Sequence, residues 1–108
     1  MEGKCKEKFE EWYLDECVNI SKAPIDIRNI ELDRFYENMP CEQWGVIQDF
    51  ADSVGYYLEV FSDDVLDLPY GSQISISENI IWWGKVFKTR QEARTAAIEK
   101  LNQLINKE

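Results

Sequence analysis

The sequence predicts an α+β domain with elements in the order α-α-α-β-β-β-α, the strands forming a three-stranded antiparallel sheet. Three observations carry this prediction. Apolar residues repeat at helical spacing up to Val54, they alternate with polar residues between Tyr56 and Phe87, and a helical repeat returns after Thr89. Because the strands are consecutive and joined by turn-type connections, we expect an antiparallel sheet with helices packed against it.

The first helix is predicted from a stripe of sulfur-containing and aromatic side chains. Their intervals place them on one helical face: Cys5, Phe9, Trp12, Tyr13 and Cys17. Most of the neighbouring carboxylates fall on other faces. The segment from Ser21 to Pro24 then ends the helix, because proline interrupts helical hydrogen bonding.

Two further helices are expected before the sheet. The shorter one runs from Glu31 to Asn38 and ends before Pro40; its apolar residues Leu32, Phe35, Tyr36 and Met39 repeat at helical spacing. The longer one runs from Glu42 to Val54 and buries Trp44, Ile47, Phe50, Ala51 and Val54. Gly55 follows the last apolar position, where a left-handed residue commonly ends a helix.

The three strands are predicted from alternation and from β-branched and aromatic content. The first spans Tyr56 to Phe61, and a long acidic connection from Ser62 to Ser72 follows it. The second spans Gln73 to Ser77. A tight turn at Glu78-Asn79 then leads into the third strand, from Ile80 to Phe87.

The last helix has a capping-box signature. Thr89 is expected to cap its N-terminus, with Glu92 reaching back to the Thr89 amide. The buried stripe is predicted to be Ala93, Ala97, Leu101, Leu104 and Ile105. The chain of 108 residues is expected to form one domain, with residues 1–40 as an N-terminal helical extension of an α-β-β-β-α unit at 41–108.

Both faces of the third strand are apolar. Strict alternation places Ile80, Trp82, Gly84 and Val86 on one face, and Ile81, Trp83, Lys85 and Phe87 on the other. We expect the N-terminal helices to cover the second face. The alternative is that another chain covers it, which would make Trp82 and Trp83 a candidate aromatic interface.

Neither a metal nor a cofactor is expected. The chain has no histidine, and its three cysteines form no CxxC pair, so zinc patterns are absent. The acidic residues Asp63, Asp64 and Asp67 do not follow the EF-hand register and read as a solvated loop. Without histidine or a glycine-rich phosphate loop, catalysis is not expected either.

Location and partners are predicted from charge and hydropathy. No apolar run is long enough for a membrane span and no signal peptide is visible, so a cytoplasmic protein without membrane contact is expected. Residues 1–84 hold 18 acids and 6 bases, whereas residues 85–108 hold 3 acids and 6 bases. This balance disfavours nucleic acid and favours a protein partner with a basic surface. The candidate acidic contact surface comprises Asp26, Glu31, Asp33, Glu37, Asp49, Asp52, Asp63, Asp64 and Asp67.

The stretch from Glu42 to Ile105 resembles the double-stranded-RNA-binding domain in its order of elements. The likeness is greatest where Arg90-Gln91-Glu92-Ala93-Arg94 is followed by Ala96-Ala97, although Gln91 stands where that family carries lysine. The resemblance implies phosphate contacts by Thr89, Arg90 and Arg94. RNA or DNA binding through this basic helix start is therefore kept as an alternative.

Three blocks also resemble small uncharacterised proteins of bacteriophages and of prophages of gut bacteria. They are Phe9 to Tyr13, Met39 to Gly55 and Phe87 to Arg94. This resemblance implies a mobile-element origin and a location in the cytoplasm of a bacterial host. The leading hypothesis is a non-enzymatic accessory protein that binds a host macromolecule, in its sharpest form an acidic inhibitor of a nucleic-acid-handling host protein. A homo-oligomeric structural protein is a further alternative.

Overall fold

The computed structural model describes residues 2–19, 22–38, 40–62 and 70–108, and it confirms the predicted order of elements. A π-helical turn, η1, continues the first helix. The elements are α1 (Gly3–Trp12), η1 (Tyr13–Cys17), α2 (Ile25–Glu37), α3 (Pro40–Ser53), β1 (Tyr57–Ser62), β2 (Tyr70–Ile76), β3 (Asn79–Phe87) and α4 (Arg90–Asn106).

The second helix begins earlier than predicted, at Ile25 instead of Glu31. The carbonyl of Pro24 accepts hydrogen bonds from the amides of Ile27 and Arg28, at 3.1 and 3.2 Å, and so starts the helix directly after the proline. Sequence periodicity missed this first turn because its isoleucines are exposed and form no buried stripe.

Two other helix predictions are also corrected. Cys17 is exposed, whereas Leu14 is buried, because the wider π-helical turn rotates the side chains of η1 away from the stripe of α1. Val54 lies beyond the end of α3 and is exposed. Gly55 does take a positive φ of 94°, and the amide of Tyr56 donates to the carbonyl of Ala51 at 2.8 Å, as expected for a left-handed helix end.

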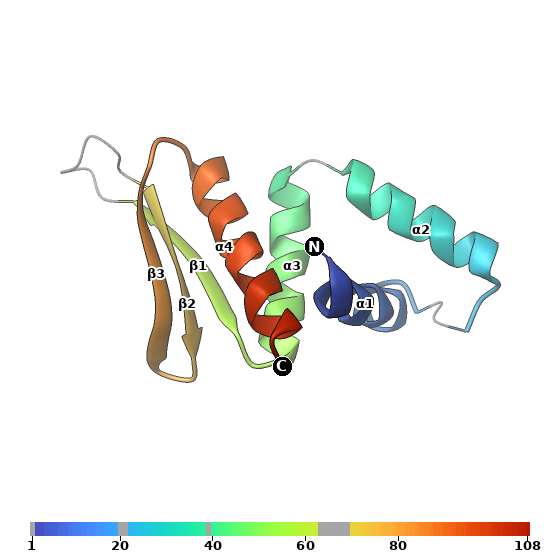
Figure 1. Cartoon of the computed structure of the whole chain (residues 1–108). Coiled ribbons are helices and arrows are strands. Elements are labelled where there is room, and N and C mark those ends of the chain that lie inside the picture. Colours follow the sequence, from blue (N-terminus) through green and yellow to red (C-terminus); the bar gives the residue numbers. More distant parts are fainter. Residues whose placement is uncertain (1, 20–21, 39, 63–69) are drawn as a thin grey trace.

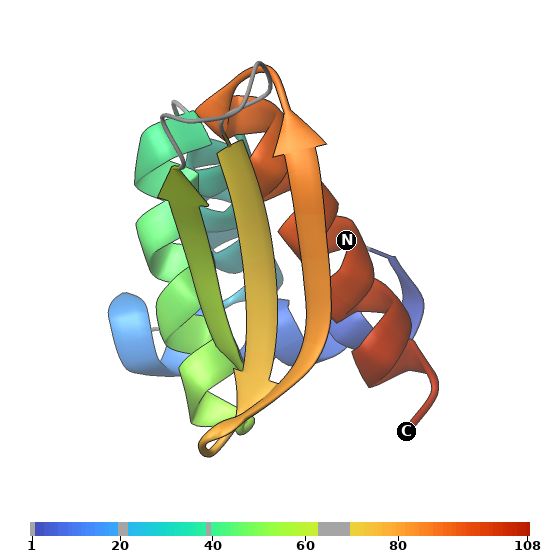
Figure 2. The same ribbon diagram turned by 90° about the vertical axis from the view of Figure 1, so that its left-hand side faces the viewer.

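The sheet is antiparallel, with β2 between β1 and β3 (Figure 2). Its second strand starts at Tyr70, so the predicted acidic connection is wrong for Tyr70 to Ser72, while residues 63–69 of that connection lie outside the described residues. The tight turn between β2 and β3 is at Ser77-Glu78, one residue earlier than predicted, and Ser77 adopts a φ of 56°.

The helices form two layers on one side of the sheet (Figure 1). The inner layer, α3 and α4, covers one face of the sheet; α1 and α2 pack on the far side of the inner layer. The prediction that the N-terminal helices cover the second sheet face is therefore wrong. Their aromatic side chains find apolar partners on α3 instead: the Phe9 and Phe50 rings lie edge to face at 5.3 Å between centroids.

One continuous core joins these layers. The Phe9 ring also contacts Phe35 of α2 at 4.9 Å and Tyr13 of η1 at 5.9 Å. On the other side of the inner layer, Leu58 of β1 and Ile74 of β2 are buried against the helices. The buried stripe of α4 is confirmed for Ala93, Ala97, Leu101 and Ile105, with Leu104 partly buried beside them.

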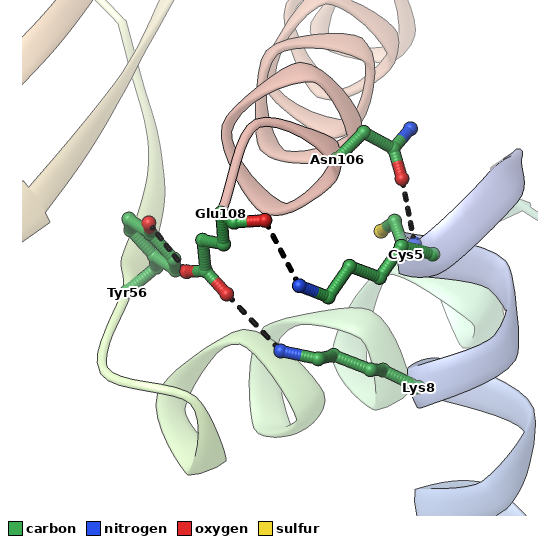
Figure 3. A network of polar contacts seen from close by, with 6 residues as sticks. Cys5, Lys8, Tyr56, Asn106 and Glu108 are labelled. Atoms are coloured by element: carbon green, nitrogen blue, oxygen red, sulfur yellow. Dashed lines mark hydrogen bonds and ion pairs between the residues drawn. The ribbon is translucent and has the colours of Figure 1, made fainter.

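The N-terminus of α1 is capped by the last helix. No side chain of its own turn does so; the amides of Glu2 and Cys5 donate to the Oδ1 atoms of Asn102 and Asn106, at 2.7 and 2.8 Å. Figure 3 shows Asn106 beside Cys5, and next to it Glu108, whose carboxylate accepts hydrogen bonds from Lys8 Nζ at 3.1 Å and Tyr56 Oη at 3.0 Å. The same Lys8 contact, followed by the Tyr56 hydroxyl, lowers the pKa of Glu108.

Replacing Asn106 with alanine is expected to lower the free energy of unfolding by about 1 kcal/mol, the usual effect of losing a helix cap. Thermal unfolding followed by circular dichroism measures the change. Gln103→Ala is the control, because Gln103 is exposed on the same helix. Equal melting temperatures for the two variants would contradict a capping role for Asn106.

Candidate interaction surface

The sheet face turned away from α3 and α4 is left uncovered by the described residues (Figure 2). Strand pairing places its side chains in rows, because paired residues in an antiparallel sheet point to the same side. Tyr57 and Ile80 flank Ser75 in one row, and Glu59 and Trp83 flank Gln73 in the next. We call this surface the open face, defined by Tyr57, Glu59, Phe61, Gln73, Ser75, Ile80 and Trp83.

Two irregularities in the pairing of β2 with β3 decide which residues reach the open face. The first, at Ile81, moves Ile80 into the outer row, so its predicted place beside Trp82 is wrong. The second irregularity, before Phe87, turns the Phe87 ring to the helix side of the sheet. There the Phe87 and Trp82 rings both lie close to Gly84. Trp82 is thus packed against the core, and Trp83 is the member of the predicted aromatic pair that is exposed, at 56%.

Aromatic rings dominate the open face. The Phe61 and Trp83 rings lie 6.2 Å apart between centroids, on the two outer strands. Phe61 lies over Gly71 of the central strand: a Cβ added to Gly71 would be 2.5 Å from the ring. The Glu59 carboxylate accepts a hydrogen bond from the Gln73 side chain at 2.8 Å. Aromatic and amide surface therefore outweighs charge among the described side chains of this face.

Sequence reasoning missed Tyr57 and Phe61 as members of this surface. The signal was present, because Leu58 and Val60 alternate with Tyr57, Glu59 and Phe61 and so mark the two sides of the strand. What the pattern could not show is that the outer side has no helix over it.

The predicted acidic surface is divided between two helices. On α2, Asp26, Asp33 and Glu37 follow one line on the side opposite the buried Phe35 ring, whereas Glu31 turns aside and pairs with Arg34 at 3.1 Å. Asp49 and Asp52 are exposed on α3. Asp63, Asp64 and Asp67 lie outside the described residues. The α2 line points away from the body of the molecule and does not continue onto α3.

The candidate phosphate contacts lie together at the start of α4 but take part in local structure. The hydroxyl of Thr89 accepts a hydrogen bond from the amide of Glu92, which confirms the cap, while Glu92 reaches the amide of Lys88 and not that of Thr89. The Arg90 guanidinium lies 5.5 Å from the centre of the Tyr70 ring. Arg94 buries its Nε without a hydrogen-bond partner among the described residues.

Several cysteine and tyrosine side chains among the described residues have a raised pKa, which favours their uncharged forms. Burial raises the pKa of the Cys5 thiol. Partial desolvation by neighbouring atoms, followed by the Asp49 and Glu16 carboxylates, raises the pKa of the exposed Cys17 thiol. Burial, Glu10 and Cys5 raise the pKa of Tyr36 to about 12. The shifts of the two thiols favour the protonated thiol over the nucleophilic thiolate. Within the described ranges, no three Cys, Asp or Glu side chains gather in a group able to hold a metal ion.

Comparison of the chain with protein-family models, with curated proteins and with solved structures returns no match. In the described part of the chain, every helix is too short or too polar to cross a membrane.

Proposed function

We propose that this protein works without catalysis, as a module that docks a partner protein on its open face. One observation carries the proposal: the exposed side chains Tyr57, Ile80 and Trp83 share this face with a single carboxylate, that of Glu59. The face is thus low in charge although the chain as a whole has a net charge of −9. Tryptophan and tyrosine are enriched at interface centres, where charged residues are depleted. Strands held by a packed helix layer also present these rings with little conformational entropy to lose.

The chemistry of the open face defines the partner. Its exposed rings suit a flat, mainly apolar protein surface, and Gln73 and Ser75 of the central strand offer hydrogen bonds between them. A strongly acidic chain repels phosphate, which supports a protein partner over nucleic acid. In the phage setting that the sequence resemblance implies, the partner is a host protein. The division of the acidic residues between α2 and α3 supports docking on the open face over imitation of a phosphate backbone.

Affinity capture with matched variants tests the proposal. The double variant Tyr57→Thr/Trp83→Thr removes exposed apolar surface from the sheet and keeps a residue suited to strands. The control, Ile27→Gln/Ile30→Gln, removes side chains of similar exposure from α2 and keeps residues suited to helices. We expect the wild type and the control to retain a common partner that the sheet variant binds at least about tenfold more weakly.

Two outcomes would contradict docking of another protein on the open face. One is retention of the same proteins by all three forms. The other is a wild-type mass in sedimentation twice that of one chain, with the sheet variant monomeric, because a second copy would then occupy the face. That result would favour the homo-oligomeric alternative.

A further inference from the structure

A cleft of about 440 Å³ opens between the first helical segment and the C-terminal half of α3. Figure 1 shows α1 and the sheet on opposite sides of α3, so a cleft lined by α1 and α3 lies away from the sheet. Its lining comes from α1, η1 and the end of α3: Lys8, Glu11, Trp12, Asp15, Glu16, Phe50, Ser53 and Val54. The volume falls in the range of ligand pockets in proteins, which is roughly 300–1,000 Å³.

The apolar wall of this cleft is built around an indole. Trp12 is partly buried, and its ring lies 5.6 Å from that of the fully buried Phe50. Val54, exposed just past the end of α3, extends the wall. A tryptophan fixed by packing in this way presents an aromatic surface whose position is set before any ligand arrives.

The rim of the cleft carries an excess of negative charge. Glu11, Asp15 and Glu16 contribute carboxylates, and the last two stand three and four positions after Trp12, on the side of the helical segment that lines the cleft. Lys8 is the lining cation, but its Nζ lies 3.1 Å from the carboxylate of Glu108 and is drawn toward the end of α4 (Figure 3). The lining therefore offers aromatic surface and carboxylates to the same ligand.

We infer that this cleft binds an arginine side chain of a partner protein. A guanidinium group is planar, stacks on an indole and donates hydrogen bonds to two carboxylates at once, whereas an ammonium ion is a strongly hydrated point charge. In this cleft Trp12 provides the stacking surface, and Glu11 and Glu16 provide the carboxylates. The site is separate from the open face, and the inference does not depend on the function proposed for that face.

Titration with two short peptides tests this inference on the full chain. One peptide, acetyl-Gly-Arg-Gly-Arg-Gly-amide, carries guanidinium groups, and its citrulline analogue has the same shape without the charge. The reporter is the indole N–H resonance of Trp12 in the nuclear magnetic resonance spectrum. We expect a saturable shift with the arginine peptide and binding of the citrulline peptide about tenfold weaker or less.

Charge-matched variants show whether the cleft itself is responsible. Glu11→Gln/Glu16→Gln and the control Glu37→Gln/Glu78→Gln remove the same charge from exposed positions. We expect affinity for the arginine peptide to fall about fivefold in the first and to stay within about twofold in the second. Equal losses in both variants, equal binding of the citrulline peptide, or no saturable Trp12 shift would overturn the inference. Binding of free N-acetyl-arginine amide as tight as that of the peptide would overturn the assignment to a protein partner.

Discussion

Phe9→Ala is expected to lower the free energy of unfolding by about 3–5 kcal/mol, the largest stability effect anticipated for this chain. The Phe9 side chain is fully buried, and its ring touches aromatic partners on three other elements, η1, α2 and α3. Truncation removes these contacts and leaves a cavity between the helix layers, which collapses only partially.

Urea unfolding followed by circular dichroism at the helix band measures this loss. Glu7→Ala serves as the control, because Glu7 is exposed on the same helix. A single transition shifted to lower urea is expected for Phe9→Ala and almost no shift for the control. A loss below about 1 kcal/mol would show that the N-terminal helices contribute little to the common core.

Gly71→Ala is expected to destabilise the protein by about 1–3 kcal/mol, through overpacking on the central strand. A Cβ at this position would be 2.5 Å from the Phe61 ring and 2.9 Å from the carbonyl oxygen of Gly84. The ring can rotate away, but the Gly84 carbonyl belongs to the neighbouring strand, so β3 must shift. The variant is thus also expected to displace Phe61 from its place beside Trp83.

Gly45→Ala provides a matched control for this substitution. Nothing lies within 4 Å of a Cβ added to Gly45, which is on the exposed side of α3. Alanine there is expected to stabilise the helix by roughly 0.5–1 kcal/mol. Opposite shifts in melting temperature are therefore expected for the same chemical change. A Gly71→Ala variant as stable as the wild type would contradict close packing over the central strand.

The elements of this fold were largely predictable, because helical and alternating repeats record which side of each segment is buried. Thr89 and Gly55 mark helix ends by their own chemistry, and both were found at the expected places. The start of α2 was missed because its first turn buries little. The bulges of β3 were missed because they arise from pairing with β2, which strict alternation along one strand does not record.

The surface at which a partner is proposed to dock was less predictable than the fold. Trp83 was identified as a candidate from the sequence, but its exposure depends on where the N-terminal helices pack. The apolar stripe of these helices could pack on any apolar surface. They pack on α3 and not on the sheet because of contacts such as that of Phe9 with Phe50. Such contacts join residues far apart in the chain, and periodicity within one segment does not reveal them.

The capping of α1 by α4 has a consequence for how the chain folds as it is synthesised. The residues that satisfy the first amides are separated from them by 100 and 101 positions. During translation α1 therefore leaves the ribosome before Asn102 and Asn106 have been added to the chain, and the amides of Glu2 and Cys5 gain their caps only when α4 follows. Completion of the native structure thus waits for the synthesis of α4, in keeping with the slow formation of contacts between distant parts of a chain.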